Sequence, residues 1–100
     1  MTFIDKYNLI AKRLETGPLS IEIGVGQKKI NPDAIGIDVI DSLACDVVGD
    51  AIEVLNSLPD SCVESVYASH FIEHVDSVSE LLDSLVRVCS SGAKIIFIAP

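Results

Sequence analysis

The sequence has few cysteines and no long apolar run. Its three cysteines, Cys45, Cys62 and Cys89, are scattered and form no CxxC pair, so we expect free thiols rather than disulfides or a metal site. The longest apolar runs are far shorter than the roughly 20 residues that span a bilayer. Asp5 and Lys6 interrupt the stretch where a secretory signal would be apolar. These absences predict a cytoplasmic protein.

Basic residues are also scarce, with seven against fifteen acidic residues and a net charge of −8. An acidic chain repels nucleic-acid phosphates and anionic membrane surfaces. We therefore expect neither nucleic acid nor a membrane as a partner.

What is present is enough apolar sequence for a packed core, because 49% of the 100 residues are hydrophobic. This length predicts a single domain over residues 1–100, with an N-terminal helix in residues 1–18 and a sheet core in residues 19–100. Apolar strands that alternate with helices indicate an α/β fold with a parallel sheet.

The expected elements follow from apolar spacing and from glycine and proline positions. Phe3, Tyr7, Ile10 and Leu14 predict one face of a helix that ends at Gly17. Another helix is expected to begin after Ser77, which has capping-box spacing with Glu80. Gly92 is the expected glycine at its C-terminal end. Its predicted buried face comprises Val78, Leu81, Leu82, Leu85 and Val88. Strands are predicted at 19–24, 34–38, 44–48, 63–68 and 95–99, and a short helix at 51–57.

The first predicted core strand runs into two glycines, in Ile21-Glu22-Ile23-Gly24-Val25-Gly26-Gln27. Glycine lets a backbone pass close to a ligand because no Cβ blocks the approach. Only seven residues separate Gly26 from the next apolar run at Ala34. That is too short for an ordinary crossover helix, so at most one helical turn is expected there.

Polar residues fall at or near the ends of successive predicted strands: Glu22, Asp38, Asp50 and His70. Ligands of open parallel sheets bind outside the carboxyl ends of the strands. Asp38 is placed to accept the hydroxyls of a ribose, and Asp50 to meet an adenine amino group. Either acid alone could equally be a solvated strand end, but their joint placement favours a nucleoside site.

The expected ligand carries no phosphate. A dinucleotide fingerprint needs a third glycine where Lys29 stands, and a helix N-terminus for the pyrophosphate. A phosphate-binding P-loop needs Gly-Lys-Ser/Thr, which Gly26-Gln27-Lys28-Lys29 does not supply. A nicotinamide-dependent oxidoreductase is therefore disfavoured.

Several motifs together resemble a known family: Glu22-Ile-Gly-Val-Gly, Gly36-Ile-Asp38, Asp46-Val-Val-Gly-Asp50-Ala and Tyr67-Ala-Ser-His70-Phe-Ile-Glu73-His74. From about residue 20 to residue 100, the chain resembles a class I S-adenosylmethionine-dependent methyltransferase of the branch with a short first crossover. The resemblance implies a Rossmann-like open sheet of about five parallel strands, in the order 3-2-1-4-5, with helices on both faces.

The resemblance also implies roles for matching residues and S-adenosylmethionine as cofactor. Ser69 and His70 would line the methionine end and the path to a small or medium acceptor, and His70 is the first candidate for a general base. The other implied cofactor contacts are Glu22, Gly24 and Gly26 for the methionine part, Asp38 for the ribose, and Asp50 with the Ala51 amide for the adenine.

The stretch from His70 to His74 also matches the HxxEH pattern of zinc proteases. A protease would need a helix here and a third ligand downstream, and no later histidine exists. A second alternative is a divalent-ion site like the Glu-x-x-Glu-His of some methyltransferases. Because His70 replaces the first glutamate, Glu73 and His74 are better interpreted as residues that order the loop, and no metal is expected.

The sequence departs from the family at its end, because members continue through two more strands beyond the fifth. Residues 95–99 would then form an apolar sheet edge with unpaired amides. Either the chain is a fragment or this edge pairs with another copy, giving a homodimer. The alternative function is accordingly a truncated nucleoside-binding module without turnover.

Overall fold

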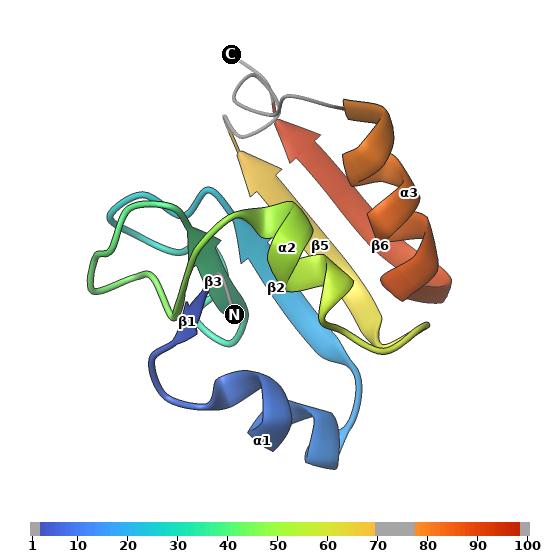
Figure 1. The fold of residues 1–100 in the computed structure, drawn as a ribbon, viewed down its shortest axis with the longest axis horizontal. Coiled ribbons are helices and arrows are strands. Elements are labelled where there is room, and N and C mark those ends of the chain that lie inside the picture. The colour runs from blue at the N-terminus through green and yellow to red at the C-terminus, as the bar shows by residue number, and fades with distance from the viewer. Residues whose placement is uncertain (1–2, 70–77, 99–100) are drawn as a thin grey trace.

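The computed structural model describes residues 3–69 and 78–98, which form a six-stranded sheet with three helices (Figure 1). The strand order is β1-β4-β3-β2-β5-β6. All neighbouring strands are parallel except β1 and β4. In chain order the elements are β1 (Ile4–Asp5), α1 (Leu9–Thr16), β2 (Leu19–Ile23), β3 (Ile35–Asp38), β4 (Val47–Val48), α2 (Ala51–Asn56), β5 (Val63–Ser69), α3 (Val78–Val88) and β6 (Cys89–Ile98).

The α/β class and the mostly parallel sheet are confirmed. The predicted order 3-2-1-4-5 corresponds to β4-β3-β2-β5-β6, and the short antiparallel strand β1 adds a sixth member beside β4. The third predicted strand, 44–48, is reduced to the two residues of β4. The fifth begins at Cys89 instead of residue 95.

The prediction of a helix over residues 3–15 is wrong in its first half. Ile4 and Asp5 pair with Val48 and Val47 of β4. The Asp5 carboxylate then accepts hydrogen bonds from the amides of Leu9 and Ile10 at 2.9 and 3.0 Å. These bonds satisfy first-turn amides that have no acceptor within the helix, so α1 begins at Leu9.

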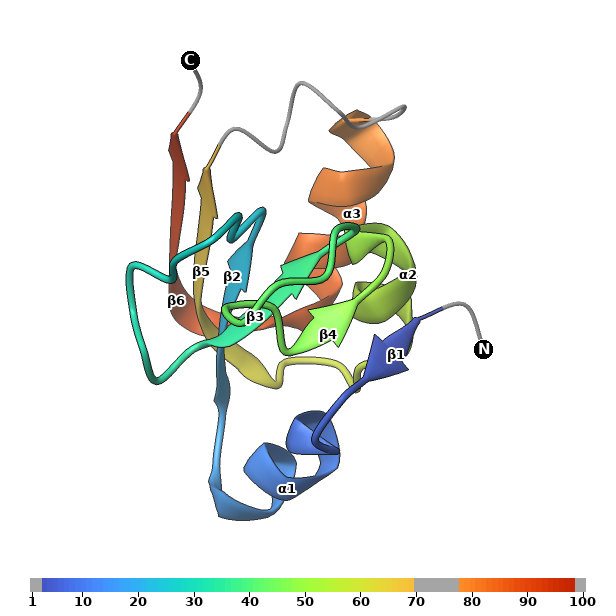
Figure 2. The same cartoon turned by 90° about the vertical axis from the view of Figure 1, so that its left-hand side faces the viewer.

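One face of the sheet carries the hydrophobic core. Ile21 of β2 lies opposite Ile35 of β3 and Val66 of β5 in the register, and all three are at most 2% exposed. Both α2 and α3 lie on the same side of the sheet (Figure 2), and α1 packs against the same core, whereas helices were predicted on both faces. The rest of this core is made of Leu19, Ile23, Ile37, Val47, Ala51, Val54, Leu55, Leu58, Val63, Ala68, Leu81, Leu85 and Val88.

Arg87 joins the two helices that cover this core. Its guanidinium donates to the carbonyl of Leu55 at 2.8 Å and to that of Leu58 at 2.9 Å, at the C-terminal end of α2. It also forms an ion pair with Asp60 at 2.7 Å. A cation at a helix C-terminus satisfies carbonyls that have no amide partner in the helix, so Arg87 fixes α3 against α2.

The helix α3 is rotated relative to the predicted buried face. Leu81, Leu85 and Val88 are buried as expected, but Val78 and Leu82 are 41% and 44% exposed. The buried polar position is Ser84, whose hydroxyl donates to Asn56 of α2 over 3.2 Å. The predicted cap Ser77 lies outside the described residues.

Gly92 does not end α3, contrary to the prediction, because the helix stops at Val88 and the chain passes directly into β6. Gly92 has a φ of 82° and lies within an irregular stretch, where the register passes from Val63–Cys89 to Ser65–Lys94. The glycine therefore serves a bulge in the strand, a role that also needs a left-handed backbone.

Candidate functional site

The carboxyl ends of three neighbouring strands are joined by backbone hydrogen bonds. The amide of Gly24, just after β2, donates to the carbonyl of Ile37 in β3 over 2.8 Å. The amide of Gly49, just after β4, donates to the carbonyl of Asp38 over 2.8 Å. The loops after β2 and β4 therefore meet at the end of β3, as expected for a parallel sheet.

The glycine loop folds back over the end of β3. Gly24 and Gly26 have φ values of 76° and 58°, in the left-handed region that favours glycine. The Gly26 amide donates to Oδ2 of Asp38 over 3.0 Å, and the Gly26 carbonyl accepts from the Ser42 hydroxyl over 2.7 Å. A Cβ on Gly26 would meet nothing within 4 Å, so conformation rather than space calls for glycine here.

Asp38 keeps capacity for further hydrogen bonds. Its carboxylate accepts from the amides of Gly26 (3.0 Å) and Ile40 (3.2 Å), one on each oxygen. An ionised carboxylate has about four acceptor directions. The half-buried carboxylate can therefore accept two more donors, which suits the adjacent hydroxyls of a ribose.

Asp50 lies just before α2 and is its N-cap residue. Its Oδ1 accepts from the amides of Ile52 (2.8 Å) and Glu53 (3.4 Å), while Ala51 opens the helix and is 3% exposed. The second carboxylate oxygen, Oδ2, has no hydrogen bond among the described residues. The structure thus gives Asp50 a structural role that the sequence analysis missed, although an acid just before a predicted helix is the usual signal for one.

Glu22 is 2% exposed, and its carboxylate faces the loop between β2 and β3. It accepts from the amide of Ile30 at 2.9 and 3.0 Å and from that of Asn31 at 3.1 Å. The predicted contact of Glu22 with a methionine group stays a prediction. The observed bonds anchor the loop instead.

Ser69 is the last residue of β5 and lies opposite Ile98 of β6. Its neighbour Ala68 pairs with Ile23 of β2, so Ser69 lies at the level of the glycine loop. The remaining predicted residues of this segment, His70, Glu73 and His74, lie outside the described residues.

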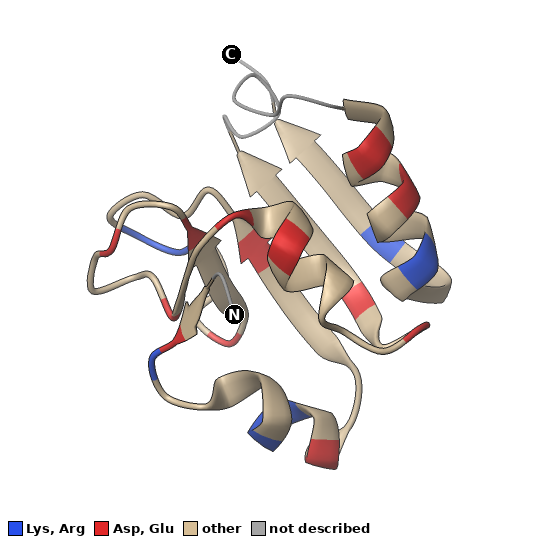
Figure 3. Ribbon diagram, viewed as in Figure 1, with Lys and Arg blue, Asp and Glu red and all other residues tan. Residues whose placement is uncertain are grey.

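Figure 3 marks the acidic and basic residues along the ribbon, and some of those near the carboxyl ends of β2, β3 and β4 form ion pairs. Lys6 pairs with Asp41 at 2.7 Å, and Lys29 pairs with Asp46 at 2.8 Å. Across residues 3–69 and 78–98, neither Asp38 nor Asp50 takes part in an ion pair. Within the described residues, Asp38 and Asp50 thus have backbone amides as partners and no basic side chain.

Burial raises the pKa of one thiol near the carboxyl ends of β3 and β4. Cys45 is fully buried, and its Sγ lies 3.2 Å from the carbonyl of Val47. Burial in an apolar environment raises the pKa of the Cys45 thiol, because a thiolate would lose its hydration. Cys45 is therefore an inert, protonated core residue, in line with the interpretation of the cysteines as small apolar side chains.

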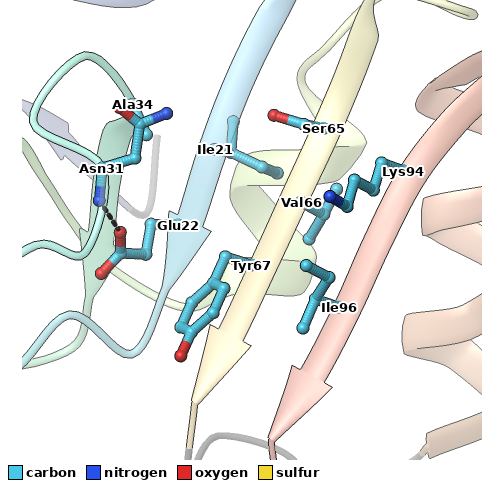
Figure 4. Close-up of a pocket in the computed structure, with 9 residues that line it drawn as sticks. All are labelled: Ile21, Glu22, Asn31, Ala34, Ser65, Val66, Tyr67, Lys94 and Ile96. Atoms are coloured by element: carbon cyan, nitrogen blue, oxygen red, sulfur yellow. Dashed lines mark hydrogen bonds between the residues drawn. The ribbon is translucent and has the colours of Figure 1, made fainter.

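A pocket of about 170 Å³ lies on the sheet face opposite the core (Figure 4). It contains none of Gly24, Gly26, Asp38 and Asp50, and it is smaller than the roughly 300 Å³ of the smallest typical ligand sites. The sequence analysis missed it, although alternation of polar side chains along the strands could have indicated this face. Its lining is Ile21, Glu22, Asn31, Ala34, Ser65, Val66, Tyr67, Lys94 and Ile96.

The described part of the chain lacks two kinds of feature. No group of three or more His, Cys, Asp or Glu side chains is placed there to hold a metal ion. None of the helices there is long and apolar enough to cross a membrane.

Sequence comparisons relate the chain to known proteins. The family described as a methyltransferase domain matches residues 22–97. Over 90 residues the chain is 30% identical to ajmaline N-methyltransferase from Rauvolfia serpentina. This match covers 90% of the chain but only 30% of the relative's length. No solved structure matches the chain at a significant level. Together with the α/β fold, the family match over residues 22–97 shows that this chain belongs to the class I methyltransferase family.

Proposed function

We propose that this chain binds S-adenosylmethionine at the carboxyl ends of β2, β3 and β4 and takes part in methyl transfer to a small or medium acceptor. The observation that carries the proposal is the contact between the Gly26 amide and the Asp38 carboxylate. It brings a glycine loop with no Cβ in the way beside an acid that still has acceptor capacity.

The residues present fit a nucleoside with a sulfonium group. Asp38 has two free acceptor directions for ribose hydroxyls, and Oδ2 of Asp50 can accept from an adenine amino group. The Ala51 amide belongs to the first turn of α2, where amides lack an acceptor within the helix. The backbone at Gly24 and Gly26 would pass along the methionine part.

The charge at this edge separates this ligand from nicotinamide dinucleotides. Asp38 and Asp50 form no ion pair with any of residues 3–69 and 78–98, and the protein as a whole carries −8. Such a site repels a pyrophosphate but not a ligand with a positive sulfonium and ammonium group. The loop after Gly26 also forms no helix whose N-terminus could hold phosphates.

The proposed cofactor supplies a methyl group already activated by its bond to a positively charged sulfur. The residues of this chain then need to bind and orient rather than to activate. Holding reactants in line can supply roughly 7–11 kcal/mol of rate enhancement at its upper limit. The hydrogen-bonded junction of the glycine loop with β3 gives this site the rigidity that such alignment requires.

A second candidate is a nucleoside-binding module without turnover. The chain spans 30% of the length of the relative it matches. The acceptor capacity of Asp38 and Asp50 would suit a nucleoside whether or not an acceptor binds beside it.

The proposal is tested by calorimetric titration of the chain with S-adenosylhomocysteine, with NAD as the control ligand. We expect saturable binding of S-adenosylhomocysteine and none of NAD. Binding of neither ligand, or of NAD alone, would refute the cofactor assignment. A second assay measures release of S-adenosylhomocysteine from S-adenosylmethionine across a panel of small amines and alcohols. Binding without any release would favour the module over the enzyme.

A further inference from the structure

A buried ion pair connects the loop between β2 and β3 to the segment before β4. Nζ of Lys29 lies 2.8 Å from Oδ2 of Asp46, and the two side chains are 18% and 9% exposed. The same ammonium donates to the carbonyl of Ala34 at 3.0 Å, and the same carboxylate oxygen accepts from the amide of Gly36 at 2.8 Å. A single pair therefore joins the loop, β3 and the approach to β4.

The stem of Lys29 packs over β3 as well. A Cβ built on Gly36 would lie 3.3 Å from Cδ of Lys29 and only 2.5 Å from the carbonyl oxygen of Ala44. Contacts this close leave no room for any residue but glycine at position 36. Lys29 is thus a packed and hydrogen-bonded side chain, unlike the exposed neighbour Lys28.

The loop has a second anchor on its other side. Glu22 of β2 accepts from the amides of Ile30 and Asn31. Residues 29–31 are therefore held by one carboxylate from β2 and by another from the segment before β4. These two anchors hold the loop against the sheet, as a packed crossover helix holds the connection in a longer βαβ unit.

We propose that Lys29 and Asp46 are positioning residues that hold the glycine loop so that the Gly26 amide faces Asp38. A loop without this ion pair would sample more conformations, and a ligand would have to order it on binding. The consequence for affinity rests on the proposed function, whereas the consequence for the loop itself does not.

The variants must separate positioning from folding. Lys29→Met alone leaves the Asp46 charge buried and unpaired, which is strongly destabilising in general. The double variant Lys29→Met/Asp46→Asn removes both charges, and the Asn oxygen can still accept from Gly36. Lys29→Arg keeps the charge, and Lys28→Met is the matched control at an exposed lysine.

Amide hydrogen exchange gives the readout that needs no ligand. In the double variant we expect the amides of Gly26 and Ile30 to exchange about tenfold faster. The corresponding change in the free energy of local opening lies in the range of coupling free energies between contacting residues. We expect core amides such as Ile21 to keep their protection. Lys29→Arg and Lys28→Met should resemble the wild type. Unchanged exchange at Gly26, or loss of cooperative unfolding in the double variant, would overturn the positioning role.

Calorimetric titration with S-adenosylhomocysteine gives the second readout. We expect about tenfold weaker binding for the double variant. Lys29→Arg should bind with the affinity of the wild type. Faster exchange with unchanged affinity would overturn the link between the ion pair and the ligand site. If the wild type fails to bind, the proposed function is refuted, and the exchange measurement still decides whether the pair positions the loop.

Discussion

Gly26 and Asp38 are twelve residues apart in the chain, and the amide of the first donates to the carboxylate of the second over 3.0 Å. This bond sets one carboxylate oxygen against the glycine loop, while the other accepts from Ile40. The orientation of the remaining acceptor directions of Asp38 is thereby fixed by backbone on both sides.

Replacing Asp38 with alanine should abolish most cofactor affinity. Loss of two charge-assisted bonds to ribose hydroxyls, each worth about 1.5 kcal/mol or more, corresponds to roughly a hundredfold weaker binding. The fold should persist, because Asp38 is only half buried. Calorimetry with S-adenosylhomocysteine measures the change, with the exposed Asp83→Ala on α3 as control. Equal affinities for wild type and Asp38→Ala would contradict the ribose assignment.

Substitutions of Asp50 should separate its two roles. Asp50→Ala removes the cap of α2 and should lower the free energy of unfolding by about 1 kcal/mol. Asp50→Ser restores a capping oxygen but is too short to reach an adenine amino group. We expect Asp50→Ser to unfold like the wild type in urea and to bind S-adenosylhomocysteine as weakly as Asp50→Ala. Recovery of affinity along with stability would leave the cap as the sole role of Asp50.

Glu22→Gln tests whether this residue anchors the loop. A glutamine has one acceptor oxygen, and its NH₂ group would face the amides of Ile30 and Asn31, so the free energy of unfolding should fall by about 1–3 kcal/mol. Glu64→Gln, at an exposed position of β5, should unfold like the wild type. Urea denaturation measures both. A Glu22→Gln variant of unchanged stability but lost affinity would instead make Glu22 a direct ligand contact.

Stability should fall at alkaline pH because of Cys45. Burial raises the pKa of the Cys45 thiol above its usual value of about 9.0. Between the unfolded and folded pKa values, the native state therefore holds a proton that the unfolded state has lost. The contribution of Cys45 to the free energy of unfolding should therefore be constant below the unfolded pKa. It should decrease as the pH rises above about 9. Urea titrations at several pH values measure the decrease, which should be shallower in Cys45→Ala. Parallel curves for the two proteins would rule out this origin.

The sheet edge formed by β6 should cause self-association. In the described part of the sheet β6 is outermost, and its residues Ile95 to Ile98 are each 36–42% exposed. Unpaired amides beside apolar side chains favour pairing with another copy. We expect light scattering to show association that grows with concentration and is reduced by Ile96→Lys.

Leu43→Lys is the matched control for this edge, because Leu43 is 98% exposed on a loop away from β6. It changes the charge in the same way and should leave association unaltered. A wild-type chain that stays monomeric at high concentration would refute pairing through β6.

Much of the candidate site could be predicted from the sequence, because its acidic residues stand at or near the ends of successive predicted strands. Asp38 and Asp50 were selected as acids at strand ends, and the structure places Asp38 at the end of β3, where the Gly49 amide, next to Asp50, donates to its carbonyl. The absence of a crossover helix was predicted from the seven residues between Gly26 and Ala34, a length that no packing arrangement can change.

The misjudged elements share one cause, which is competition from partners distant in sequence. Phe3, Ile10 and Leu14 have helical spacing, yet residues 4 and 5 pair with β4 because an open sheet edge was available there. Val78 and Leu82 have core spacing, but Arg87 and Ser84 bind α2 and turn α3 so that both apolar residues are exposed. Local periodicity contains no information about such partners.

The sequence by itself determined the fold class and the glycine loop, because apolar periodicity and the lack of a Cβ act locally, whereas the strand order came from the family resemblance. Only the tertiary structure decided what the buried charges do. Lys29 differs from Lys28, and Glu22 and Asp46 from exposed acids, solely by what folding places around them. A charge removed from water must find specific partners, and those partners come from other strands.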